Sequence, residues 1–376
     1  MAPGESVPVP SVQYTRVTIT GHVHGHQLAP TTDIIAIPDP VSHNYETMIR
    51  RHPPEAMLLT STLALNILLT NDDSWASANI RATYSALKAD GHDVLLVGPA
   101  VQQSGKGGTF VLPTTNITAP GGEFGSIPVG APFFGNDVND PNIFYFNGTP
   151  AATAIFGLDI VVPMHFGKES VDLVVSGPNE GQNNGPFLYT LSGTIGAAYA
   201  SVERGIPAIA LSAGNSTHRS FTTNTGKADD PANIAGRLTA NFVVALAHGI
   251  NTKKDRLLPL GVGIGINFPT FGPGSNCSAP PFTLTRMTGG ATVDKVSINP
   301  ATGFPISTDL VAPGLNTPLN GLTKLPGETP TSAGCKTAVS VFAVDYDAPI
   351  QVAAPIQSRL HPIFGKTQLP DKPGHA

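Results

Sequence analysis

Short apolar runs alternate with segments of helical periodicity along the middle of the chain. The runs carry almost no charge, which is typical of strands that are buried on both faces of a parallel sheet. They lie at 65–69, 94–97, 144–146, 171–175, 208–211 and 262–266, with a further run at 338–344. Helices are predicted between them, near 77–90, 150–158, 192–203 and 234–247. This alternation predicts an α/β fold, a Rossmann-like three-layer α/β/α sandwich.

The regular pattern is bounded on both sides by less regular sequence. Residues 1–64 mix Pro, Gly, His and Thr without a sustained period, so we expect a poorly ordered N-terminal segment. The apolar stretch at 57–64 is either the remnant of a secretion signal or the lead-in to the first strand. Residues 65–376 are expected to form one domain, with a core at 65–267 and a Pro/Gly-rich extension with strands at 268–376.

Composition narrows the class of protein. The chain has 376 residues of which 40% are hydrophobic, enough for a packed core. Only 12% are charged, and the net charge of -5 arises without a basic block, so no nucleic acid polymer and no anionic membrane is expected as a partner. The 40 Gly and 36 Pro predict many turns and long loops. No apolar run is long enough to span a bilayer.

The first apolar run ends abruptly in Asn71, Asp72 and Asp73. Ligands of open α/β sheets bind beyond the carboxyl ends of the strands, and adjacent carboxylates there repel each other unless a cation or a shared proton compensates. The acidic pair therefore indicates a metal site. The alternative is an ordinary helix cap followed by a turn.

Further polar segments follow other predicted strands. Residues 104–108 do not match a phosphate-binding P-loop, because their Lys is not followed by Ser or Thr. A second polar loop at 176–185 directly follows the strand at 171–175. Residues 192–194 open a helix whose free amide groups favour an anion. Each feature alone has a simpler explanation as loop residues or a helix cap, so only their combination indicates a site.

Four of these motifs occur in the order in which one known family carries them. They are Asn71-Asp72-Asp73, Ser104-Gly105, Ser176-Gly177-Pro178-Asn179 and Ser192-Gly193-Thr194. Over roughly residues 65–267 the chain therefore resembles the SurE family of metal-dependent nucleotidases and phosphatases. The resemblance implies that a divalent cation is held by Asp72, Asp73, Ser104 and Asn179.

The chemistry of these residues suits that implication. All of them offer oxygen atoms and two are anionic, a set that fits Mg²⁺ or Mn²⁺. Phosphate binding is expected from Asn71, Ser192, Gly193 and Thr194, because the last three lie at a helix start. Asp72 is the expected catalytic residue, which orients or deprotonates the attacking water.

The resemblance implies hydrolysis of nucleoside monophosphates or other small phosphate monoesters, so the expected partner is a small phosphorylated substrate. A non-catalytic secreted binding protein on the same scaffold is the alternative. The sequence leaves the oligomeric state open, with a homodimer among the options. Some positions depart from the family: Ser74 stands where a Gly usually follows the Asp pair, and Ala152 and Thr153 stand where an acid and a Cys commonly occur.

Two features bear on the cellular compartment. Cys277 and Cys335 are either a disulfide, which would indicate an oxidising compartment, or two free thiols. Glycosylation acceptor patterns begin at Asn116, Asn147, Asn215 and Asn276. Secretion is therefore the expected location, with the cytoplasm as the alternative.

Overall fold

The chain divides into two units, 1–59 and 60–376, and all described residues belong to the second. The computed structural model describes residues 63–167, 170–214, 217–248, 250, 255–272, 274–277, 279–289, 292–313, 324–360 and 363. The N-terminal segment predicted at 1–64, including the signal remnant predicted at 57–64, lies outside this range except for its last two residues. None of the helices in the described part of the chain combines the length and hydropathy needed to cross a bilayer.

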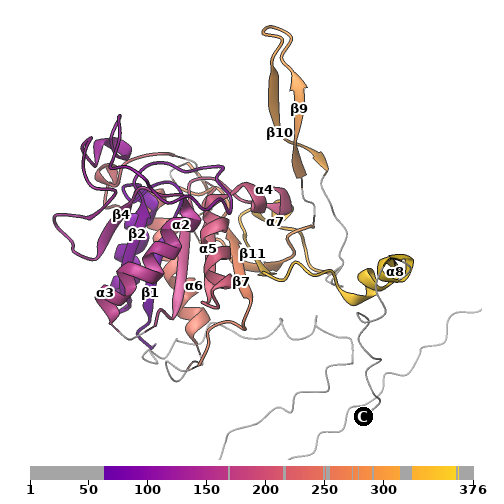
Figure 1. Ribbon diagram of the computed structural model, residues 1–376, viewed down its shortest axis with the longest axis horizontal. Helices are drawn as coiled ribbons and strands as arrows, with labels where there is room; N and C mark the ends of the chain where they lie inside the picture. Colours follow the sequence, from indigo (N-terminus) through magenta and orange to yellow (C-terminus); the bar gives the residue numbers. More distant parts are fainter. Residues whose placement is uncertain are drawn as a thin grey trace, which may run out of the picture. The chain divides into compact units, whose positions relative to one another are not determined.

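A single large sheet forms the centre of this unit (Figure 1). Within the described residues its nine strands follow the order β3-β4-β2-β1-β5-β6-β7-β11-β8. The strands from β4 to β7 in this order run parallel, whereas β3 and β11 are antiparallel to their inner neighbours. The strand bounds are β1 Asn66–Thr70, β2 Asp93–Pro99, β3 Phe134–Asn136, β4 Ile143–Phe146, β5 Leu173–Asn179, β6 Ala208–Ser212, β7 Val262–Asn267, β8 Phe282–Thr285 and β11 Thr337–Ala343.

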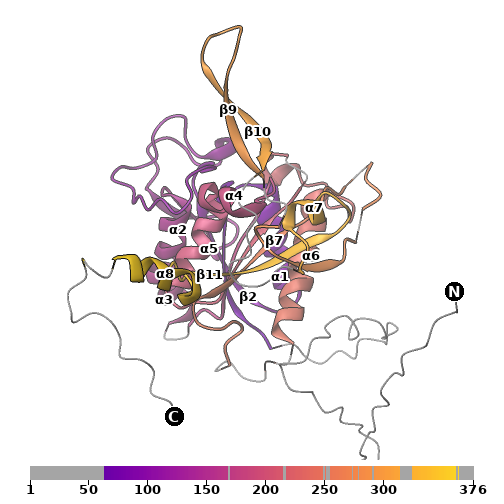
Figure 2. The ribbon, with the colours of Figure 1, turned by 90° about the vertical axis from the view of Figure 1, so that its right-hand side faces the viewer.

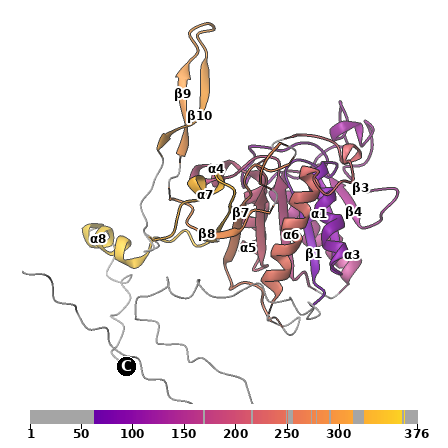
Figure 3. The same cartoon turned by 180° about the vertical axis from the view of Figure 1, so that it is seen from behind.

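Helices cover both faces of the sheet, as Figures 1 and 3 show from opposite sides. On one face α1 (Ala78–Ala89) packs against α6 (Pro231–Ala247), and on the other α2 (Pro150–Phe156) packs against α5 (Gly193–Glu203). Figure 2 shows α2 and α5 on one side of the strands and α6 on the other. The predicted three-layer α/β/α sandwich is therefore confirmed.

Strand β1 shows why the apolar runs are continuous rather than alternating. Ile67 and Leu69 lie in the core that includes residues of α1 and α6, whereas Leu68 lies in the core that includes residues of α2 and α5. All three side chains are fully buried. A strand that is covered on both faces needs apolar side chains at every position, and this is the pattern from which it was predicted.

Several elements differ from the prediction or were not predicted. The helix predicted at 150–158 continues beyond α2 through a π-helical turn, Gly157–Val161, into α3 (Val162–Phe166). Strand β5 extends four residues further than predicted, to Asn179, into the polar sequence. The strands β9 (Thr292–Ile298) and β10 (Pro305–Pro313) form a hairpin in the extension, where strands were predicted without bounds. The unpredicted elements include η1 (Glu123–Gly125), α4 (Gly185–Leu191), α7 (Glu328–Ser332) and α8 (Ile350–Leu360).

The C-terminal extension is an integral part of the fold. Its strand β11 pairs antiparallel with β7 and parallel with β8, so the extension completes one edge of the sheet. Cys277 and Cys335 form a disulfide with a Cα–Cα distance of 5.5 Å. The bond joins the segment after β7 to the residues just before β11.

Close packing of α4 on the sheet depends on a glycine in β7. A Cβ atom at Gly265 would lie 1.6 Å from the hydroxyl oxygen of Tyr189, a residue of α4. Tyr189 also packs edge-on against Phe342 of β11, with 5.9 Å between the ring centroids. The absence of a side chain at Gly265 therefore lets an aromatic ring seat α4 against the sheet.

We expect the substitution Gly265→Ala to lower the free energy of unfolding by about 1 to 3 kcal/mol, because the new methyl group overlaps the Tyr189 hydroxyl. Urea denaturation of the single and double variants measures this. Tyr189→Phe removes the overlapping oxygen, so the double variant should recover part of the loss. Strictly additive effects in this double-mutant cycle would contradict the packing described.

Candidate functional site

The candidate residues meet where the strand order of the sheet reverses. The chain passes from β1 to β2 on one side and returns to β5 on the other, so β1 lies between these two strands. Ligands of doubly wound sheets bind at such a switch point, beyond the carboxyl ends of the strands. The loop after β1 carries Asp72 and Asp73, the loop after β2 carries Ser104, and Asn179 is the last residue of β5.

Asp72 is bound by groups from two other segments. Its side-chain Oδ1 accepts a hydrogen bond of 2.5 Å from the hydroxyl of Thr194, in the first turn of α5. Its backbone carbonyl accepts from the amide of Gln103, at 2.7 Å, in the loop after β2. The Asp72 carboxylate is almost completely buried. The position of Asp72 is therefore fixed by α5 and by the loop after β2.

Asp73 is held between the loops that follow β2 and β5. Its Oδ1 accepts from Nε2 of Gln102 at 3.1 Å, and its Oδ2 accepts from the amide of Glu180 at 2.9 Å. Like Asp72, it is almost completely buried. Both oxygens of this carboxylate are thus oriented by neighbouring loops.

The electrostatics of the pair call for a compensating positive charge. Burial raises the pKa of Asp72, and hydrogen bonds from Thr194 and Gly193 only partly oppose that effect. Burial raises the pKa of Asp73 well above its usual value, and the negative charges of Asp72 and Glu180 add to the rise. The two carboxylates are therefore not both ionised without compensation. Either one of them keeps a proton or a cation binds beside them.

The other predicted metal ligands fit a hard cation. The Nδ2 of Asn179 donates to the carbonyl of Gly181 at 2.8 Å, whereas its buried Oδ1 has no hydrogen-bond partner among the described residues. Ser104 is exposed, and its amide donates to Oε1 of Gln102 at 2.7 Å, which links it to Asp73. No cluster of three His, Cys, Asp or Glu side chains suited to a metal occurs in the described ranges. The donor set instead combines two carboxylates with amide and hydroxyl oxygens, as Mg²⁺ and Mn²⁺ accept.

The predicted phosphate-binding residues of α5 lie directly against Asp72. Ser192 is the N-cap of α5, and its Oγ accepts from the amide of Ile195 at 3.3 Å. A Cβ atom at Gly193 would lie 2.9 Å from Cβ of Asp72, so only glycine allows this approach. The hydroxyl of Thr194 donates a hydrogen bond to the carboxylate of Asp72. The α5 N-terminus and the acidic pair are therefore parts of one site.

Asn71 and Ser74 shape the turn that carries the acidic pair. The Nδ2 of Asn71 donates to the carbonyl of Ser74 at 3.0 Å, and its buried Oδ1 is without a hydrogen-bond partner in the described part of the chain. Ser74 has a φ of 103°, a left-handed conformation that favours glycine. The resemblance to the SurE family led us to expect Gly at this position. The backbone therefore keeps the turn despite the substitution.

The structure also brings in residues to which the sequence assigned no role. His218 lies between two carboxylates, with Nδ1 at 2.8 Å from Oε2 of Glu180 and Nε2 at 2.9 Å from Oε1 of Glu123. Burial raises the pKa of Glu180 to about 7, although His218 opposes the shift. Glu180 follows a recognised motif, but Glu123 and His218 stand alone in irregular sequence. No spacing signal could have identified them.

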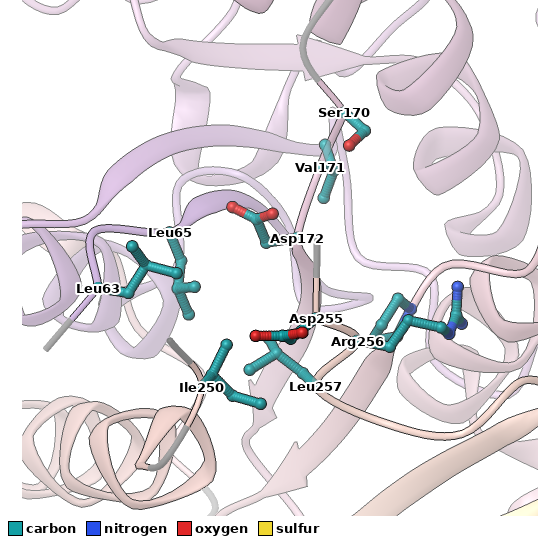
Figure 4. Close-up of a pocket in the computed structure, with 10 residues that line it drawn as sticks. Leu63, Leu65, Ser170, Val171, Asp172, Ile250, Asp255, Arg256 and Leu257 are labelled. Atoms are coloured by element: carbon teal, nitrogen blue, oxygen red, sulfur yellow. The ribbon is translucent and has the colours of Figure 1, made fainter. Parts of the chain in front are cut away.

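A cavity of about 200 Å³ lies at the opposite ends of the strands from the candidate site (Figure 4). Its lining includes Leu65, just before β1, and Asp172, just before β5, together with Asp255 and Arg256. It is therefore at the amino ends of the parallel strands. None of the candidate metal or phosphate residues lines it.

Comparisons with known proteins agree with this geometry. The sequence model of the family described as "Survival protein SurE" matches residues 67–292. A protein of Yarrowia lipolytica named "Acid phosphatase" is 46% identical over 297 residues, which cover 77% of this chain and 82% of that protein. A "5'-nucleotidase SurE" of Methanocella arvoryzae is 33% identical over 150 residues, which cover 40% of this chain and 49% of that protein.

A solved structure shows the same fold. The crystal structure of the SurE protein from Aquifex aeolicus superimposes with a TM-score of 0.54 and 22% sequence identity, and the match covers 78% of this chain and 99% of that one. At this identity the likeness concerns the fold alone. The family match over more than half of the chain and the close fungal relative decide the assignment: the chain belongs to the SurE family.

Proposed function

We propose that this protein is a metal-dependent phosphomonoesterase that hydrolyses nucleoside monophosphates or other small phosphate monoesters. The observation that carries the proposal is the buried Asp72 and Asp73 pair at the switch point of the sheet. On the neighbouring strand, the Oδ1 of Asn179 has no hydrogen-bond partner among the described residues. The relatives support it, since the fungal one is named an acid phosphatase and the archaeal one a 5'-nucleotidase.

Asp72, Asp73, Ser104 and Asn179 would hold the cation, either Mg²⁺ or Mn²⁺. When bound, the cation supplies Lewis-acid activation of the phosphoryl group and lowers the pKa of a coordinated water. The chain's own groups do the positioning. Thr194 donates to one oxygen of Asp72 and so orients the carboxylate, which would both hold the cation and orient or deprotonate the attacking water. The N-terminus of α5 favours the negative charge of phosphate oxygens beside Gly193.

We further propose that the chain matures in an oxidising compartment and is secreted. The disulfide between Cys277 and Cys335 supports this, because such bonds persist mainly outside the cytosol. Of the four glycosylation acceptor patterns, those at Asn116 and Asn147 lie entirely within the described residues. Asn116 is exposed, whereas Thr149 in the Asn147 pattern donates its hydroxyl to the carbonyl of Thr109 at 2.6 Å.

Removing one carboxylate should abolish the activity. We expect Asp73→Asn to reduce phosphate release from a panel of nucleoside and sugar monophosphates by more than roughly 100-fold, since changing even the partners of metal ligands costs roughly 10- to 100-fold. The assay is run with Mg²⁺, with Mn²⁺ and with a chelator.

Asp159→Asn is the matched control, because Asp159 forms an exposed ion pair with Arg204, at the end of α5 opposite to its Ser192 N-cap. It should retain full activity. An absence of metal-dependent release from wild-type protein would exclude the phosphatase and favour the non-catalytic alternative. Full activity of Asp73→Asn would exclude the proposed ligand set.

Stability measurements test the same site without catalysis. The pKa of Asp73 is raised by folding, so its stabilising contribution is complete only below the unfolded pKa and is lost as pH rises. In the presence of a chelator, Asp73→Asn should therefore melt roughly 2 to 4 °C above wild type at pH 8, with a smaller difference at pH 5. Mg²⁺ should raise the wild-type melting temperature at pH 8 but not that of the variant.

The compartment proposal has its own test. Protein secreted from a eukaryotic host should carry a glycan at Asn116 and none at Asn147, as measured by peptide mass spectrometry. Asn116→Gln should remove that glycan. A secreted chain with unmodified Asn116 and two free thiols would argue against the proposed route.

A further inference from the structure

A single imidazole joins three loops that lie beyond the carboxyl ends of the parallel strands. His218 precedes α6, Glu123 begins η1, and Glu180 directly follows β5. The two ring nitrogens of His218 lie 2.8 Å and 2.9 Å from the carboxylates of Glu180 and Glu123. Phe124 covers the ring, with 4.6 Å between the ring centroids.

The contacts continue from this bridge to the proposed metal ligands. The second oxygen of Glu123, Oε2, accepts from the amide of Gln102 at 2.8 Å. The side chain of Gln102 then donates to Asp73 at 3.1 Å and accepts from the amide of Ser104 at 2.7 Å. Gln102 is therefore the residue that ties two candidate ligands from different loops to each other.

The bridge reaches Asp73 by a second route as well. Glu180, on the other side of His218, donates its amide to Oδ2 of Asp73 at 2.9 Å. The two oxygens of Asp73 are thus held by two arms that His218 joins. Without His218, the carboxylates of Glu123 and Glu180 would face each other with no donor between them, and like charges would push the arms apart.

The local backbone indicates that this arrangement is specified rather than incidental. Phe124 has a φ of 55°, and it is one of the two non-glycine residues with positive φ among the described residues, the other being Ser74 in the acidic turn. Such conformations persist only where the surroundings determine them, and they concentrate at functional sites. Ser74 directly follows Asp73, and Phe124 directly follows Glu123, which orients Asp73 through Gln102.

We propose that Gln102, Glu123, His218 and Glu180 are positioning residues that hold Asp73 and Ser104 in the geometry required for cation binding. They act through the ligands, because metal ligands need partners that fix their orientation. The proposal rests on the proposed function, since it assumes that Asp73 and Ser104 bind a divalent cation. It adds four residues that lie outside the motifs of the family, and one of them, His218, comes from a loop after β6 that carries no such motif.

Calorimetric titration of metal-free protein with Mn²⁺ tests the proposal directly. We expect His218→Gln to weaken Mn²⁺ binding by about tenfold, because Gln cannot bridge both carboxylates. The Mn²⁺ concentration for half-maximal phosphate release should rise by a similar factor, whereas kcat at saturating Mn²⁺ should remain close to that of wild type. A purely structural role would instead lower the melting temperature without shifting the Mn²⁺ affinity.

His165→Gln provides a matched control. His165 is similarly exposed, 32% against 35% for His218, and it also lies beside a carboxylate, that of Asp93 at the amino end of β2. It should leave Mn²⁺ affinity unchanged. Equal losses in the two His variants, or a change of less than twofold in His218→Gln, would overturn the proposal.

Glu123 offers a second and independent comparison. Glu123→Gln keeps an oxygen that can accept from Gln102, so its Mn²⁺ affinity should stay within about threefold of wild type, whereas Glu123→Ala should lose about tenfold. If His218→Gln fails to fold, this pair decides, and equal affinities in both Glu123 variants would overturn the proposal. Failure of the proposed function is distinguishable, because wild-type protein would then bind no Mn²⁺ in a manner that depends on Asp73.

Discussion

The electrostatics of the site depend on the burial of two adjacent carboxylates at the end of one central strand. Asp72 and Asp73 are removed from water, and each raises the cost of ionising the other. Hydrogen bonds from Thr194, Gln102 and the Glu180 amide reduce that cost without removing it. A proton or the proposed cation would offset this cost, because positive charge compensates both groups.

The topology of the sheet makes this arrangement possible. Since β1 lies between β2 and β5, the loops that follow these three strands emerge side by side. Each loop is irregular by itself, but each is anchored by a buried strand whose side chains belong to two cores. The precision of the site therefore comes from the sheet, while its chemistry comes from the loops.

The C-terminal extension contributes to the same site from a distance. Its buried Glu328 accepts from the amide of Gly185 at 2.8 Å, and its Ser332 accepts from Nδ2 of Asn184 at 3.0 Å. These bonds hold the end of the loop that begins at Asn179. The extension therefore supports the loop that follows Asn179 as well as completing the sheet through β11.

The sequence by itself determined the core strands and the layer arrangement, because uncharged runs that alternate with helical periodicity are typical of a parallel sheet covered on both faces. It also placed Asn71, Asp72 and Asp73 at the end of one such run. It also singled out the motifs of Ser104, Asn179 and α5. Only the tertiary structure decided that Gln102, Glu123 and His218 belong to the site. Their roles depend on contacts between loops that are far apart along the chain, and no local periodicity or spacing records such contacts.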